Sequence, residues 1–130
     1  MRYFTVQEAE ELIPALKGII RDAQEIKLNI EAKVEEWRRT HKSMGPAEEA
    51  VIRGQIEYLA KSMESKLNEM TEMGCILKDL DLGLTDFPAR IGEKEAYLCW
   101  RSGEENIRFW HGITEGYSGR KPLEKEDVLR

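Results

Sequence analysis

Residues 74–123 read GCILKDLDLG LTDFPARIGE KEAYLCWRSG EENIRFWHGI TEGYSGRKPL. This stretch is crowded with glycine, proline, aromatic and titratable residues, whereas the first half of the chain is mostly Glu, Lys, Ala and aliphatic residues. Short runs of alternating character, separated by turn formers, predict a three-stranded antiparallel meander. The expected strands are residues 86–91, 95–101 and 106–113, with turns at 92–94 and 102–105.

The expected register of this sheet divides its side chains between two faces. Pro88 has no N–H to donate, so the first run should be an edge strand and the strand containing Cys99 should be central. An even second turn pairs Trp100 with Ile107 and Leu98 with Phe109. The core face then carries Leu98, Trp100, Ile107 and Phe109, joined by Phe87 and Ala89 if the first turn is also even. The opposite face carries Asp86, Arg90, Tyr97, Cys99, Arg101, Arg108 and Trp110.

The first half of the chain carries the periodicity of a long helix. Thr5 and Glu8 have the spacing of a capping box, which marks a helix start. Apolar residues then recur every three or four positions as far as Trp37, which predicts an amphipathic helix reaching Thr40. Pro14 removes one backbone donor and should bend this helix without ending it.

A second helix is expected after a short break. Residues 41–46 contain the only convincing turn signal before Gly74, and Pro46 suits the first turn of a helix. Apolar spacing resumes and continues to Met73, where Gly74 is a natural stop. Because a short connection joins antiparallel neighbours, the two helices should form a hairpin with coiled-coil-like packing.

The expected fold is therefore α+β, with a helical hairpin capped by a small sheet and a loop-rich tail. A single domain should span residues 1–130, with the hairpin at 5–73, the cap at 74–123 and a charged tail at 124–130. Helices of about 50 Å and 40 Å exceed the width of a compact domain of this size. We expect a homodimer built around four helices, with a monomer covered lengthwise by the C-terminal segment as the alternative.

Composition excludes several classes of partner. Charged residues make up 35% of the chain, the net charge is −5, and acids and bases are interspersed, so no nucleic-acid-binding surface is expected. No segment has the length and apolarity to span a membrane, and no apolar leader is evident, so a cytoplasmic location is expected. In that compartment Cys75 and Cys99 should be free thiols.

A zinc site is the first chemistry to consider. Cys75, Cys99 and His111, with Asp79 or Asp81, include the residue types that bind zinc. The even register, however, places Cys99 and His111 on opposite faces of the sheet, and no pair of these residues has metal-site spacing. We therefore predict no metal and no cofactor, and interpret Cys99 as a buried thiol and His111 as a hydrogen-bonded structural histidine.

Carboxylates form a second candidate. Asp79, Asp81 and Asp86 could divide acid and base roles. The run from Lys78 to Gly83 has the composition of a loop leaving a helix, in which Asp accepts backbone hydrogen bonds, so turn formation is favoured over catalysis.

Arginines interleaved with aromatic residues form the third candidate. Guanidinium groups beside Tyr97 and Trp110 suit an anion or an acidic protein partner. They equally suit internal ion pairs with Asp79, Asp86, Glu104 and Glu115, which we favour. The predicted ligand-binding set is Asp86, Arg90, Arg101, Arg108, Trp110 and Arg120.

Two functional hypotheses follow. The first is a non-enzymatic module that dimerises through its helices and presents the arginine and tryptophan face to an acidic partner or small anion. The second is an enzyme or metal-dependent protein with a site in the loops around the sheet, formed by Asp79, Asp81, Glu104 and His111 together with Asp86. No reaction can be named from the residues, and the first hypothesis is favoured.

Three motifs resemble the bacterial domain of unknown function 2203 family, and the resemblance extends over nearly the whole chain. They are Tyr3-Phe4-Thr5-x-x-Glu8-Ala9 with Leu12-x-Pro14, Leu77-Lys78-Asp79-Leu80-Asp81-x-Gly83 with Asp86-Phe87-Pro88-Ala89-Arg90, and Leu98-Cys99-Trp100-Arg101-x-Gly103-Glu104 continuing through Trp110-His111 to Pro122-Leu123. The family usually has Asn where this chain has Glu10. The resemblance implies helices followed by a motif-rich cap and brings no activity, because the family is uncharacterised.

Overall fold

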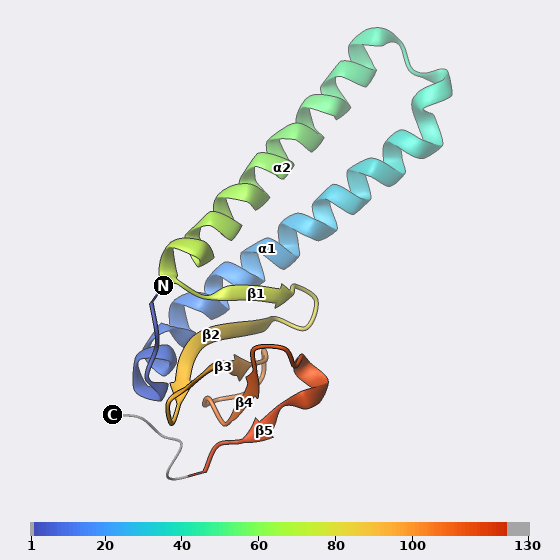
Figure 1. Cartoon of the computed structure of the whole chain (residues 1–130). Helices are drawn as coiled ribbons and strands as arrows, with labels where there is room; N and C mark the ends of the chain where they lie inside the picture. The colour runs from blue at the N-terminus through green and yellow to red at the C-terminus, as the bar shows by residue number, and fades with distance from the viewer. Residues whose placement is uncertain (1, 125–130) are drawn as a thin grey trace.

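The chain folds as a long helical hairpin with a five-stranded sheet at one end (Figure 1). The computed structural model describes residues 2–124; the predicted tail, apart from Glu124, lies outside them. The α+β class and the hairpin are confirmed, but the sheet has five strands where three were predicted. The elements are α1 Val6–Thr40, η1 His41–Ser43, α2 Pro46–Met73, β1 Ile76–Asp79, β2 Leu84–Ile91, β3 Lys94–Trp100, β4 Phe109–Gly112, η2 Tyr117–Gly119 and β5 Lys121–Pro122.

The predicted helix ends are confirmed by their capping groups. Thr5 and Glu8 form both hydrogen bonds of the capping box, and α1 continues through Pro14. Pro46 occupies the first turn of α2, and Gly74 ends it in the left-handed conformation with φ +93°. Among the described residues, no helix is long and apolar enough to cross a membrane.

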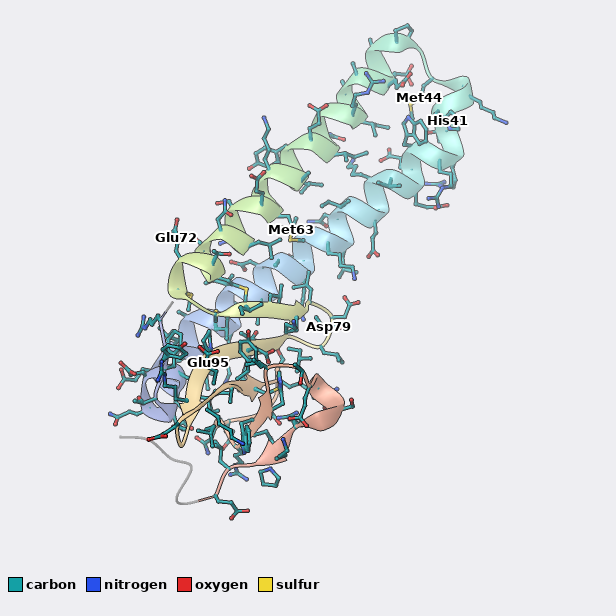
Figure 2. The ribbon with its side chains drawn as sticks, viewed as in Figure 1. His41, Met44, Met63, Glu72, Asp79 and Glu95 are labelled. Carbon is teal, nitrogen blue, oxygen red and sulfur yellow. The ribbon has the colours of Figure 1, made fainter. Side chains whose placement is uncertain are left out.

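The hydrophobic core joins one face of the sheet to the first half of α1. Phe87, Leu98 and Trp100 pack there against Ile13 and Leu16. Along α1, every residue of which is described, the last buried side chain is Ala23. The rest of the hairpin extends away from the sheet (Figure 1). Figure 2 shows His41 and Met44 at the far tip, remote from Asp79 and Glu95.

Two of the five strands were not predicted. β1 uses part of the segment interpreted as a loop, and pairs Ile76 with Asp86 and Leu77 with Thr85. β5 consists of two residues and pairs Pro122 with Phe109. Neither is long enough to show a clear alternation of apolar and polar residues, which is the signal that identifies a strand from sequence.

The prediction that Pro88 marks an edge strand is wrong, because β2 has a neighbour on both sides. At Pro88 itself, however, only β3 is paired with β2. β2 lies between β1 and β3, and β3 is the central strand, as predicted. The pairing with β1 ends at Asp86, so Pro88 lies beyond the reach of that neighbour. The Phe4 N–H donates to the Pro88 carbonyl at 2.7 Å. The missing N–H of proline therefore leaves no gap in a ladder.

The even first turn on which the face of Phe87 depended is present, whereas the predicted register between β3 and β4 is wrong. Phe87 pairs with Leu98, so the two side chains share a face, as expected. On the other side, Leu98 pairs with Trp110 and Cys99 with Phe109, one residue away from the expected alignment. This single step exchanges the faces of β4, because alternate strand residues point to opposite sides. Trp110 therefore shares the face of Leu98, and Phe109 shares the face of Cys99.

The connection between β3 and β4 explains the error. Two carboxylates accept its backbone N–H groups: Glu104 accepts from Arg101 at 2.8 Å, and Glu10 of α1 accepts from Ile107 at 2.9 Å. The Trp100 indole N–H also donates to the Glu104 carbonyl at 2.9 Å. These N–H groups are unavailable to a tight hairpin, so β4 begins only at Phe109.

The turn between β1 and β2 provides a test of the packing. Gly83 has φ +63°, and a Cβ there would lie 1.9 Å from Oγ and 2.7 Å from Cβ of Ser102. Gly92 has a similar φ of +67°, but a Cβ there would meet nothing within 4 Å. Both Gly→Ala substitutions should cost the left-handed backbone penalty of about 1–2 kcal/mol. Gly83→Ala should lose a further ~1–3 kcal/mol from overpacking. Urea unfolding measures both; equal losses would contradict the packing described.

Candidate functional site

A buried polar cluster lies on the sheet face opposite α1. Asp86 of β2, Cys99 of β3 and His111 of β4 are 2%, 0% and 3% exposed. One potential ligand atom from each lies within 4.8 Å of the other two. The observed register creates the cluster, because Asp86 pairs with Cys99 while His111 pairs with Tyr97 on that same face.

His111 is held by hydrogen bonds at both ring nitrogens. Its Nε2 lies 3.0 and 3.1 Å from the Asp86 carboxylate oxygens, and its Nδ1 lies 2.9 Å from the Gly112 carbonyl oxygen. A carbonyl oxygen only accepts, so Nδ1 carries a proton. Without a further cation, Nε2 would then present a lone pair to the carboxylate. The two groups must therefore share a proton or another cation.

Cys99 is a protonated thiol at neutral pH. Burial raises the pKa of Cys99 to about 12; Arg120 opposes this shift, whereas the charges of Asp86 and Glu104 and a hydrogen bond to Asp86 add to it. A thiolate nucleophile requires the opposite environment, electropositive and partly exposed. The trio therefore lacks the activated thiol of a cysteine hydrolase.

The sequence argument against a metal site was wrong in its premise. It placed Cys99 and His111 on opposite faces, but the shifted register puts them on the same face. Cys75, which shared the sequence-based candidate set, lies in the core instead, where its thiol donates to the Met70 carbonyl at 3.4 Å. Burial raises the pKa of Cys75 to about 11.

Two of the predicted arginines converge on Tyr117. The Arg101 Nη1 donates to the Tyr117 hydroxyl at 3.0 Å, and the Arg120 guanidinium carbon lies 4.9 Å from the ring centre. Hydrogen bonds from both guanidinium groups lower the pKa of Tyr117, and the bond from Arg101 has the larger effect. The Arg120 Nη2 also forms an ion pair with Glu104 at 2.7 Å. Glu104 thus already occupies the anion position beside Arg120.

The remaining members of the predicted ligand-binding set do not join this group. The Arg90 guanidinium lies over the Tyr3 ring at 4.5 Å, and Trp110 lies on the core-facing side, with the Lys121 Nζ 4.3 Å from its ring. Arg108 is exposed in the loop before β4, and Asp86 is buried. The expected continuous arginine and tryptophan surface is therefore not formed.

The alternative carboxylate and histidine site is also divided. Asp79 accepts the Leu82 N–H at 3.0 Å, in keeping with its predicted turn role, and Asp81 pairs with Lys27 of α1 at 2.7 Å. Glu104 pairs with Arg120, while His111 pairs with Asp86. Of the expected arginine–carboxylate pairs, Glu104–Arg120 is present. Asp86 instead pairs with histidine, and Glu115 pairs with Lys121 at 2.6 Å.

A groove between the helices is the feature that sequence reasoning missed. Near the tip a hollow of about 630 Å³ is lined by Val51, Gly54 and Tyr58 of α2 and by facing residues of α1. A second hollow shares Asn29, Tyr58 and Leu59 with it, and a third, which shares Asp22 and Lys66 with the second, continues toward the sheet past Gly18 of α1. The two mid-helix glycines were the available signal, because glycine is unfavourable inside a helix.

The comparisons place the chain in a family. The family model described as "Uncharacterized conserved protein (DUF2203)" matches residues 2–123. The chain belongs to this family. The DUF2203 match includes both the hairpin and the sheet, so the buried cluster and the groove lie within it. No curated protein and no solved structure matches the chain. The family description names no activity.

The buried Asp86–His111 pair should contribute far more to stability than an exposed pair. Removing one partner leaves the other buried without its hydrogen bond, which typically costs about 3–5 kcal/mol. We expect a loss of that size in urea unfolding of either Asp86→Leu or His111→Leu, because leucine can neither donate nor accept a hydrogen bond. Lys27→Gln is the control, since Lys27 and Asp81 form an exposed pair that should contribute little. Comparable losses for the two pairs would refute the assignment.

The thiols should be protected in the folded chain. A free thiol is half ionised near pH 8.5, whereas folded thiols with pKa values of about 11 and 12 remain protonated there. Iodoacetamide at pH 8.5, followed by intact mass, should modify neither cysteine in the native chain and both in urea. The same difference means that stability falls as pH rises from about 8.5 toward 12. Rapid native modification of Cys99 would contradict its burial.

Proposed function

We propose that this protein is a self-assembling helical module in which two copies pair through the hairpin groove. The observation that carries the proposal is the groove, which extends from the tip hollow toward the sheet. The sheet covers only the first half of α1, so the groove faces outward in the isolated chain. A helix from a second copy would cover it and form a four-helix arrangement.

Exposed apolar side chains support a protein occupant. Tyr58 is 71% exposed and Val51 is 59% exposed, and both line the tip hollow. Contiguous apolar groups of this kind commonly mark interaction sites. A tyrosine at such a position offers a large apolar ring and a polar hydroxyl, a combination enriched at interfaces.

The mid-helix glycines support close approach by another backbone. Gly18 and Gly54 both line the groove, and a Cβ at either position would meet nothing within 4 Å. Each costs about 0.5–1 kcal/mol relative to alanine in a helix interior. Packing within the chain does not require glycine at these positions, because a Cβ there would fit. A helix seated in the groove could approach more closely where the Cβ is absent.

The charge of the hairpin tip favours a second copy over a charged partner. Residues 25–61 contain seven acidic and seven basic side chains, so the tip is neutral and the acidic excess of the hairpin lies at its sheet end. Neutral tips approach one another without long-range repulsion. Binding an acidic protein would instead require a basic excess at the contact. A two-fold pairing also uses the same surface on both copies, as isologous dimers do.

The competing hypotheses receive less support. An anion at Arg101 and Arg120 would have to displace the Glu104 carboxylate from Arg120. An enzyme site around the sheet would have to gather Asp79, Asp81 and His111, each of which already has another partner. We therefore favour assembly over anion binding and over catalysis.

We further propose that the assembled protein is cytoplasmic. Its two cysteines are free and buried at different places, Cys75 in the core and Cys99 on the opposite sheet face. Unpaired thiols suit a reducing compartment.

Sedimentation velocity at micromolar concentration tests the assembly. We expect the wild type to sediment as a dimer. Gly54→Leu and Tyr58→Arg should each yield monomers with unchanged helix content, because neither substitution disturbs a contact of the core. Ile113→Arg is the matched control: Ile113 is 56% exposed in the turn after β4, away from the groove, and this variant should remain dimeric.

The proposal would be overturned if the wild type remained monomeric at protein concentrations roughly 100 times the Kd of a dimer of micromolar affinity. A dimer that survives both groove substitutions but is lost in Ile113→Arg would also overturn it, because the interface would then lie at the sheet.

A further inference from the structure

The Asp86–Cys99–His111 cluster brings three chemically different metal ligands together where the fold could have placed apolar residues. All three are nearly inaccessible to solvent and come from adjacent strands at the centre of the sheet. Buried polar groups persist in proteins when each is paired. A cation, either a proton or a metal ion, must therefore lie between His111 and the Asp86 carboxylate.

The orientation of His111 is that of a metal ligand. Its Nδ1–H donates to the Gly112 carbonyl, which fixes the tautomer and directs the Nε2 lone pair toward Asp86. Metal-bound histidines typically donate their second ring N–H to a backbone carbonyl or a carboxylate in this way. A carboxylate oxygen and a nitrogen lone pair, 3.0 Å apart, then face the same point.

The third ligand atom completes a zinc-type set. Imidazole nitrogen, carboxylate oxygen and cysteine sulfur are the ligand atoms that Zn²⁺ uses, at about 2.0–2.3 Å from the metal. Tetrahedral geometry with these lengths separates neighbouring ligand atoms by roughly 3.3–3.8 Å. The observed separations begin at 3.0 Å and extend to no more than 4.8 Å. A shift of about 1 Å in the thiol would therefore suffice.

We propose that Asp86, Cys99 and His111 bind one divalent transition-metal ion, with zinc as the best-matched class. The metal replaces the proton between His111 and Asp86, and the Cys99 thiol proton is released to solvent as the sulfur binds. Three protein ligands leave a fourth coordination position, which water or a small ligand can occupy. The inference is independent of helical assembly, because the cluster and the groove share no residue.

Refolding in the presence of metal tests the site directly. The full chain is unfolded in urea with a chelator, freed of both, and refolded with one equivalent of Co²⁺ or Zn²⁺ so that the ion can reach a buried position. We expect one metal per chain after gel filtration, a higher melting temperature than the metal-free chain, and for Co²⁺ the sulfur-to-metal charge-transfer band in the near ultraviolet. Absence of retained metal in the wild type would overturn the proposal and leave a proton between the two side chains.

Matched variants assign the ligands. Cys99→Ser should abolish the charge-transfer band, and His111→Gln should weaken Co²⁺ binding by more than the roughly 10–100-fold that loss of an outer-shell partner costs. Cys75→Ser and His41→Gln are the controls and should bind as the wild type does, since both residues lie outside the cluster. A band that survives Cys99→Ser, or disappears in Cys75→Ser, would contradict the assignment. Metal content of the wild type is decisive even if a variant fails to fold.

Discussion

Glu10 on α1 accepts a hydrogen bond from the Ile107 N–H, and the register of β4 in the sheet depends on this contact. Together with Glu104, it removes backbone donors from the connection between β3 and β4, so that the ladder closes only at Cys99 and Phe109. A tighter hairpin would shift the register by one residue and reverse every side chain of β4. The placement of His111 beside Asp86 is therefore decided partly by a helix far away in sequence.

The buried cluster and the core occupy opposite faces of the same strands. Phe87 and Leu98 pack toward α1, while Asp86 and Cys99, their neighbours along the chain, point to the other side. Such alternation lets one strand serve packing and polar chemistry together. It also means that a polar site need not weaken the core, because the two sets of side chains do not compete for the same volume.

The hairpin is divided in a similar way along its length. Its first part is covered by the sheet, and the part beyond Ala23 has no covering element among the described residues. The exposed Tyr58 and Gly54 line the groove in this uncovered part, and the groove continues past Gly18 beside the part of α1 that packs on the sheet. An exposed aromatic ring and glycines within helices are unfavourable in an isolated chain. They occur here along a groove in which a helix of a second chain could pack against them.

Local signals in the sequence determined the helices, their ends, the α+β class and the hairpin between β2 and β3. The capping box at Thr5, the stop at Gly74 and the apolar spacing depend only on near neighbours, and so does a two-residue turn at Gly92 and Glu93. Tertiary structure alone decided the short outer strands, the register of β4 and the meeting of Asp86, Cys99 and His111. The physical reason is that a loop's length and its hydrogen-bond partners are set by contacts such as Glu10 to Ile107, which no local pattern records.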